Sequence, residues 1–187
     1  MRDALYIPLA DGNLALERLT EAHRAQLFAA CAADTAIWEI YSSNFGPENF
    51  DAAFGALIGH ASRMPYAIVV DGTVVGMTAW LRADWSAQTI EIGGSYLHPA
   101  VRGTGINGRI KRLMLDHAFA VGIRRVEFRI DERNGRSQAA VRKLGAVKEG
   151  VLRAERMTWT GHVRDTGLFS ILAEEWQAAN ASALVQP

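Results

Sequence analysis

The stretch Arg102-Gly103-Thr104-Gly105-Ile106-Asn107-Gly108 lies between a predicted strand and a predicted helix. Glycines beside a helix N-terminus leave backbone N–H groups accessible and allow a phosphate to approach closely. A nearby arginine can add a bidentate contact to the same anion. The stretch therefore predicts a site for a ligand that carries a pyrophosphate.

The composition is that of an ordinary globular chain, with 187 residues of which 49% are hydrophobic. We expect residues 1–187 to form one domain, with a core over about 7–176 and flexible last residues. No apolar run reaches the roughly 20 residues that span a bilayer, and the first residues do not resemble a signal peptide. The lone Cys31 excludes an internal disulfide. These features predict a cytoplasmic protein that does not bind membranes.

The charge is unevenly distributed along a chain whose net charge is zero. Between Arg102 and Lys143 there are 11 Lys and Arg residues and 4 Asp and Glu residues, so this segment carries +7 and the remainder −7. A basic segment on a neutral protein favours a small polyanionic ligand over nucleic acid.

The spacing of apolar residues predicts strands through most of the chain and four longer helices. Hairpin signals dominate the N-terminal half and one β-α-β unit occupies the centre, so we expect a mixed α/β sheet. The predicted strands are Leu5–Pro8, Leu14–Leu19, Tyr66–Val70, Thr73–Leu81, Gln88–Leu97, Arg125–Ile130, Val147–Trp159 and Arg164–Ala173. The predicted helices are about Thr20–Ala33, Glu48–Ser62, Gly105–Val121 and Ser137–Leu144.

The glycines fit two nucleotide-binding patterns only in part. Gly103-x-Gly105-x-x-Gly108 matches the dinucleotide fingerprint, but five residues separate it from the preceding strand and too little chain follows for a doubly wound sheet. The spacing also approaches a P-loop, yet Ile110 stands where that loop needs a metal-binding hydroxyl. Neither an oxidoreductase nor an NTPase is favoured.

The same stretch also fits the acyl-CoA loop [QR]-x-x-G-x-[GA], apart from Asn107 at the last position. From about residue 7 to Trp176, the chain resembles the GNAT N-acetyltransferases, in particular the branch that acetylates ribosomal-protein N-termini. The resemblance depends on the order and spacing of these further segments: Ile90-Glu91-Ile92-Gly93, His117-Ala118-Phe119, Arg125-Val126-Glu127, Asn134-x-x-Ser137, Leu144-Gly145-Ala146, Glu149-Gly150-Val151-Leu152-Arg153 and Gly161-x-x-Arg164-Asp165-Thr166.

This resemblance implies the GNAT acyl-CoA N-acyltransferase fold, an α/β fold with about seven mostly antiparallel strands and about four helices. Its fourth and fifth strands splay apart, and here they correspond to Gln88–Leu97 and Arg125–Ile130. Acetyl-CoA is expected in the resulting V, with its pyrophosphate on the N–H groups of residues 103–108.

The resemblance also implies contacts for the rest of the cofactor. The pantetheine amides are expected beside Tyr96 and Leu97, with a further contact from Asn134. Arg109 and Lys143 are candidates for the 3′-phosphate, although solvated side chains would look the same in the sequence.

Direct attack of an amine on a thioester needs a base for the amine and a proton donor for the thiolate. Glu91 is the first candidate base, because apolar neighbours would raise its pKa if it faces the cleft. Glu155 is the second, since it lies at the spacing from Ser137 where the ribosomal-protein branch carries a proposed base. Ser137 is either the donor to the thiolate or a helix N-cap, and Tyr96 is a weaker donor candidate.

The resulting hypothesis is an acetyl-CoA-dependent N-acetyltransferase acting on a small-molecule amine or a protein N-terminus. The alternative is a non-catalytic acyl-CoA-binding module. The scattered histidines predict no metal site, and exposed sheet edges make a homodimer possible. We interpret Arg164-Asp165 as a hairpin salt bridge rather than an acceptor contact.

Overall fold

The computed structural model describes the backbone of residues 1–185 and the side chains of residues 1–181. Its strands form one sheet in the order β1-β2-β3-β4-β5-β6-β8-β7. The strands are β1 (Leu9–Asp11), β2 (Leu14–Arg18), β3 (Met64–Val70), β4 (Thr73–Asp84), β5 (Thr89–Leu97), β6 (Arg125–Asp131), β7 (Val147–Met157) and β8 (Val163–Leu172). The α-helices are α1 (Arg2–Leu5), α2 (Arg24–Ala32), α3 (Phe50–Gly59), α4 (Ile106–Ala120), α5 (Gly135–Arg142) and α6 (Ala173–Val185).

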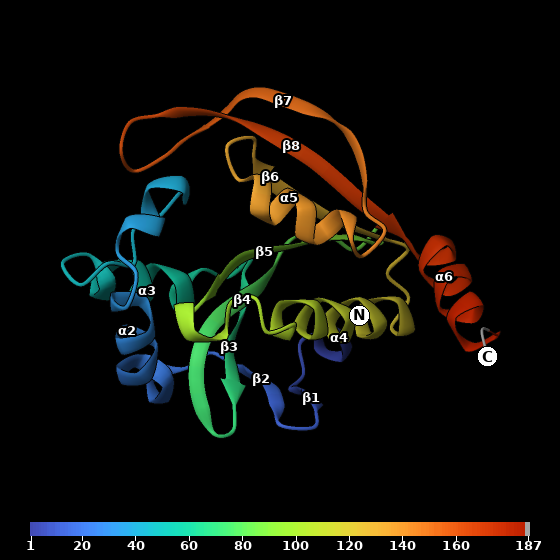
Figure 1. The fold of residues 1–187 in the computed structure, drawn as a ribbon, viewed down its shortest axis with the longest axis horizontal. Coiled ribbons are helices and arrows are strands. Elements are labelled where there is room, and N and C mark those ends of the chain that lie inside the picture. The colour runs from blue at the N-terminus through green and yellow to red at the C-terminus, as the bar shows by residue number, and fades with distance from the viewer. Residues whose placement is uncertain (186–187) are drawn as a thin grey trace.

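Two parts of the sheet diverge where β5 meets β6. These strands are parallel and pair only between Thr89–Glu91 and Arg125–Glu127, whereas every other neighbouring pair is antiparallel. Figure 1 shows β6, β7 and β8 leaving the plane of β1–β5. The splayed pair predicted from the sequence is confirmed, within a sheet of eight strands rather than about seven.

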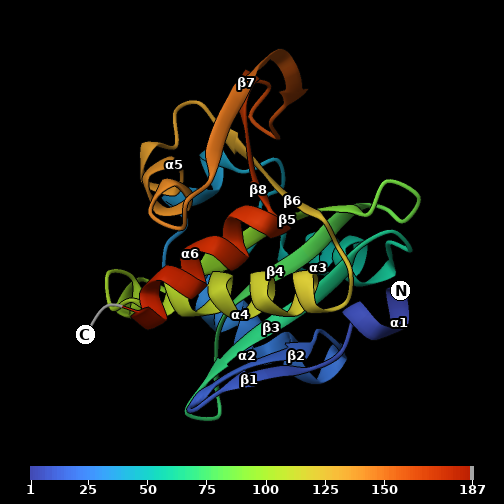
Figure 2. The same ribbon diagram turned by 90° about the vertical axis from the view of Figure 1, so that its right-hand side faces the viewer.

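Helices cover both faces of the larger part of the sheet. Figure 2 shows α4 and α6 in front of β3 and β4, with α2 and α3 behind them. Two apolar clusters result, one including Ile110 and Met114 of α4, the other including Leu27 of α2 and Phe54 of α3. Since each cluster is built on one face of the sheet, both anchor the strands that border the splay.

The chain ends differ from the prediction. Residues Arg2–Leu5 form α1 and the first strand begins only at Leu9, so the predicted strand Leu5–Pro8 is wrong. The physical reason is local: Leu5 and Tyr6 donate backbone hydrogen bonds to Met1 and Arg2, which closes a helical turn.

The other end adds a helix that the sequence prediction omits. Helix α6 is docked by Trp176, which packs on Phe119 and donates from its indole Nε1 to Asp116 Oδ1 at 2.6 Å. Residues 186–187, which belong to the expected flexible end, lie outside the described residues. In the part of the chain that is described, no helix is long and apolar enough to cross a membrane.

Gly76 keeps β4 and β5 in register beside the splay. A Cβ at this position would lie 2.1 Å from the carbonyl oxygen of Tyr96, a backbone atom that cannot move aside cheaply. We expect Gly76→Ala to lower the free energy of unfolding by ~2 kcal/mol or more. Urea unfolding measures this.

The matched control is Gly55→Ala in α3, where an added Cβ meets no atom within 4 Å. Because alanine favours helix over glycine, this variant should gain up to ~1 kcal/mol. Equal stability of both variants would show that the β4–β5 contact tolerates a side chain.

Candidate functional site

A cavity of about 730 Å³ occupies the space between the separated strands. It is bordered by β4 and β5 on one side, by β6 and α5 on the other, and by the start of α4 at one end. The splay creates this space because β5 has no strand partner after Glu91 on the side facing β6. The residues discussed below are placed relative to this cavity.

The loop that opens α4 presents a row of backbone N–H groups. Gly103 and Gly105 adopt positive φ angles of 80° and 89°, and Gly105 is the N-cap of α4. Within the described chain, no acceptor is found for the N–H groups of residues 103–108; the next N–H, of Arg109, donates to Gly105 O. Accessible N–H groups at the positive end of a helix dipole suit an anion such as a pyrophosphate.

Glycine also leaves space above this loop. A Cβ at Gly103, Gly105 or Gly108 would meet no other atom within 4 Å. Gly103, Gly105, Asn107 and Gly108 all line the cavity. The residues therefore fit the phosphate part of an acyl-CoA.

The arginines expected beside this loop have structural partners. Arg102 lines the cavity, but its Nε donates to Leu97 O at 2.8 Å and its Nη1 pairs with Asp34 Oδ2 at 2.5 Å. Arg109 lies outside the cavity lining, where its guanidinium binds Asp11 and Asn13 of the β1–β2 turn. Lys143, at the C-terminal end of α5, does line the cavity.

The strand residues Tyr96 and Leu97 face different surroundings. Leu97 lines the cavity. The Tyr96 hydroxyl donates instead to Ala30 O at 2.7 Å, its ring stacks on Trp38, and its burial raises the pKa of the phenol. The structure thus places the Tyr96 hydroxyl in the core between β5 and α2.

Glu91 lines the cavity at the last residue pair that joins β5 to β6. Its side chain is 7% exposed, and Oε2 lies 3.0 Å from Arg82 Nε and 3.8 Å from Arg129 Nε. Burial raises the pKa of the Glu91 carboxyl, although Arg82 and Arg129 oppose this shift. A carboxylate with a raised pKa in a cavity suits proton abstraction.

Gly93 provides the space for this carboxylate. A Cβ at Gly93 would lie 2.6 Å from Glu91 Oε1 and 2.8 Å from a methyl carbon of Leu81. The motif Glu91-Ile92-Gly93 therefore has a steric reason for its glycine.

Glu155, the other candidate base, lies outside the cavity lining. Its carboxylate accepts a hydrogen bond from Thr166 Oγ1 at 3.2 Å and lies 3.3 Å from Arg82 Nη2. Arg82 therefore forms ion pairs with both candidate bases, and of these two only Glu91 lines the cavity.

The start of α5 brings Asn134 and Ser137 to the cavity. Asn134, rather than Ser137, is the N-cap, since its Oδ1 accepts the Ser137 N–H at 3.0 Å. No hydrogen bond of the Ser137 hydroxyl is found among the described residues. The residue thus lines the cavity without using its hydroxyl as the cap of α5.

The sequence prediction omits a buried lysine. Lys111 lines the cavity, and its Nζ donates to Ser95 Oγ at 2.6 Å and to Thr78 Oγ1 at 3.3 Å. No carboxylate pairs with it among the described residues. The sequence does contain a sign that Lys111 is buried. It lies one turn before Leu115 and two turns before Ala118, both of which are fully buried on α4.

The sequence prediction also omits three cavity-lining arginines, Arg63, Arg129 and Arg156, and it gives Arg164, which lines the cavity as well, a structural role. The predicted Arg164–Asp165 salt bridge is wrong. Adjacent residues of a strand point to opposite faces, so Arg164 enters the cavity while Asp165 accepts the Ala154 N–H. No group of three or more His, Cys, Asp or Glu side chains that could hold a metal is found in the described region.

We predict that Lys111→Met stabilises the protein most at low pH. Burial lowers the pKa of Lys111 from 10.5 to about 7. Between these values the unfolded chain binds more protons than the folded one, so wild-type stability rises with pH. The variant should gain on the order of a few kcal/mol near pH 7, and this gain should shrink toward pH 10 in urea unfolding. A gain that is constant with pH would contradict the buried charge.

Comparison with known proteins agrees with this geometry. The family model described as "Acetyltransferase (GNAT) domain" matches residues 13–147. A GNAT-family structure from Chromobacterium violaceum is 30% identical, with a TM-score of 0.84 over 92% of this chain and 89% of the other. A GCN5-related N-acetyltransferase from Brucella melitensis is 26% identical, with a TM-score of 0.87 over 97% of this chain and 86% of the other.

A more distant structure shares the fold at 17% identity and a TM-score of 0.78, over 89% of this chain and 99% of the other. It is the Salmonella typhimurium acetyltransferase that modifies the N-terminal serine of ribosomal protein L7/L12. The search of curated proteins gave no match. The family model covers most of the chain, and the chain therefore belongs to the GNAT acetyltransferase family.

Proposed function

We propose that this protein transfers the acetyl group of acetyl-CoA to a primary amine. The observation that carries the proposal is one cavity that holds both the N–H groups opening α4 and the buried carboxylate of Glu91. The N–H groups suit the diphosphate of the donor, and the carboxylate suits removal of a proton from the acceptor. The family shows acetyl transfer in general; the donor and the acceptor are proposed.

The reaction is a direct attack. Glu91 takes a proton from the ammonium form of the acceptor, and the resulting amine forms an N–C bond with the thioester carbonyl as the C–S bond breaks. The Ser137 hydroxyl hydrogen-bonds the departing thiolate, which accepts the second proton that the nitrogen loses as the amide forms. Asn134 and the strand residue Leu97 position the pantetheine, while Lys143 is the remaining candidate for the 3′-phosphate.

Three observations favour this proposal over a non-catalytic acyl-CoA-binding module. A module that only binds CoA needs neither a buried carboxylate nor an unused hydroxyl beside its ligand. Glu91 supplies the buried carboxylate, in space that Gly93 leaves open, and Ser137 supplies the hydroxyl. A cytoplasmic location, a single domain and a homodimer are carried forward as further proposals from the sequence.

Binding of acetyl-CoA gives the first test. At 100 times its dissociation constant the ligand should add ~2.7 kcal/mol to stability, seen as a rise of several degrees in melting temperature. Gly105→Val should lose this rise, because Gly105 has a positive φ and adjoins the accessible N–H groups. Adenosine, which lacks phosphates, is the control ligand. The absence of any rise at millimolar acetyl-CoA would refute the assignment of the loop.

Substitutions at the two cavity groups give the second test. Glu91→Gln and Ser137→Ala should each bind acetyl-CoA as the wild type does, and the double variant should slow turnover at least ~100-fold. Release of CoA in an acceptor screen measures this.

Glu155→Gln is the matched control, because it keeps the partner Arg82 and lies outside the cavity lining. It should retain more activity than Glu91→Gln. The reverse order would identify Glu155 as the base.

A further inference from the structure

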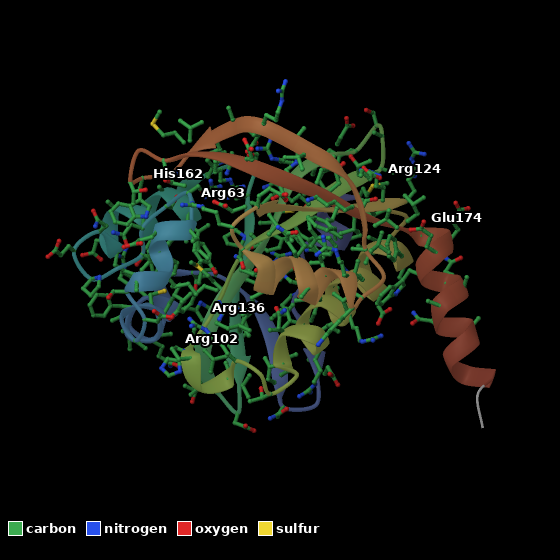
Figure 3. All side chains as sticks on the ribbon, turned by 45° about the horizontal axis from the view of Figure 1, so that its top comes forward. Arg63, Arg102, Arg124, Arg136, His162 and Glu174 are labelled. Carbon is green, nitrogen blue, oxygen red and sulfur yellow. The ribbon has the colours of Figure 1, made fainter. Side chains whose placement is uncertain are left out.

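Arginines surround the proposed base at the end of the cavity opposite the α4 loop. Arg63, Arg129, Arg156 and Arg164 line this end, which we call the arginine end, and they come from four separate parts of the chain. In the view of Figure 3, Arg63 lies toward the β7–β8 hairpin, whereas Arg102 and Arg136 lie together away from it.

The carboxylates of the arginine end are already engaged. Both oxygens of Asp131 are bound by Arg133, which does not line the cavity. Glu91 is paired with Arg82, which does not line it either. Asp131 and Glu91 therefore each make their shortest ion pair with an arginine that lies outside the cavity lining.

Among the described residues, Arg129 and Arg156 have acidic partners, whereas no ion pair is found for Arg63 or Arg164. Arg164 is 7% exposed, and its Nε donates to the neutral hydroxyl of Thr166 at 3.0 Å. Arg156 approaches Glu155 only to 3.6 Å. For Arg63, no hydrogen bond or ion pair is found among the described side chains.

The remaining arginine is shared between acidic groups. Arg129 Nη2 donates to Glu127 at 3.3 Å, and its Nε is buried without a hydrogen-bond partner. Burial lowers the pKa of both Arg63 and Arg164, and the positive charge of Arg156 lowers each further. The nearby carboxylates oppose these shifts, since Glu91 raises the pKa of Arg63, and Asp131, Glu155 and Glu91 raise that of Arg164. Arg63 and Arg164 line the cavity without an ion pair of their own among the described residues, so their guanidinium groups are available to an anion.

Building on the proposed function, we propose that the acceptor is an anionic amine, with a carboxylate or phosphate that binds the arginine end while its amine reaches Glu91. Planar guanidinium groups bind both anions bidentately, and such bonds gain strength away from water. A polyamine or a basic peptide would place further positive charge against the four arginines. The acceptor is therefore selected by charge.

The test compares acceptors that share an amine but differ in charge. β-Alanine and 2-aminoethyl phosphate carry an anionic group beside the amine, β-alaninamide carries an uncharged amide in its place, and spermidine carries further ammonium groups. Calorimetric titration onto the CoA-saturated protein measures binding without turnover, and CoA release from acetyl-CoA measures transfer. We expect at least one of the two anionic acceptors to bind about tenfold more tightly than the amide, or more. The acceptor that binds more tightly shows whether the arginine end prefers a carboxylate or a phosphate.

Two variants test whether the preference for an anionic acceptor comes from the arginine end. Arg63→Gln and Arg156→Gln should each reduce the anion-to-amide ratio about tenfold or more. Arg153→Gln, an exposed arginine on the same strand as Arg156, is the matched control and should keep the ratio. Melting temperature and acetyl-CoA binding verify that each variant is folded.

The outcomes separate the two proposals. Arginine-dependent binding of the anions without CoA release supports the arginine end and refutes the proposed catalysis. If acetyl transfer to spermidine or to β-alaninamide is as fast as transfer to the anionic acceptors, or faster, the proposed role of the arginine end is wrong. The proposed catalysis is then still supported. Absence of binding by both anionic acceptors also overturns the proposed role of the arginine end.

Discussion

The site depends on how briefly β5 and β6 pair. Three parallel residue pairs hold the two parts of the sheet together, and β6 then continues with β8 alone. Past Glu91, the β5 backbone on the side of β6 has no strand to bond. Buried peptide groups need partners, so this interior edge favours a ligand with amides of its own. The same divergence exposes the start of α4 and places Glu91 at the narrow end of the opening.

A second connection between the two parts of the sheet is made by ion pairs. Arg82 of β4 reaches Glu91 on its own side and Glu155 of β7 on the other. Arg82 and Ala154 adopt positive φ angles of 48° and 50° at irregularities of their strands. Such angles are uncommon for residues other than glycine. Arg82 makes both ion pairs, and Ala154 directly precedes Glu155, the partner in one of them.

Local signals explain which predictions succeed. The glycine loop, the helix after it and the strands on either side could be predicted because period, turn residues and motif spacing all agree there. The divergence of those strands is implied only by the resemblance to the GNAT family. Helix α6 depends on Trp176 meeting Phe119 and Asp116 across the fold, which no local pattern reveals. Arg109 had the right charge and position for a phosphate, yet the β1–β2 turn occupies its guanidinium. The arginine end is built from residues up to 101 positions apart in sequence, so only the folded chain brings it together.

The charges around Glu91 link recognition to chemistry. Burial raises the pKa of its carboxyl, while Arg82, Arg129 and Arg156 lower it. An acceptor anion at the arginine end would offset part of that positive charge, since Arg129 and Arg156 belong to it. The anionic group of the acceptor would raise the pKa of Glu91, whereas the ammonium group that Glu91 deprotonates would lower it. A cationic acceptor would only lower the pKa, because its charge favours the ionised carboxylate. In the proposed reaction the arginines would therefore affect both the binding of the acceptor and the basicity of Glu91.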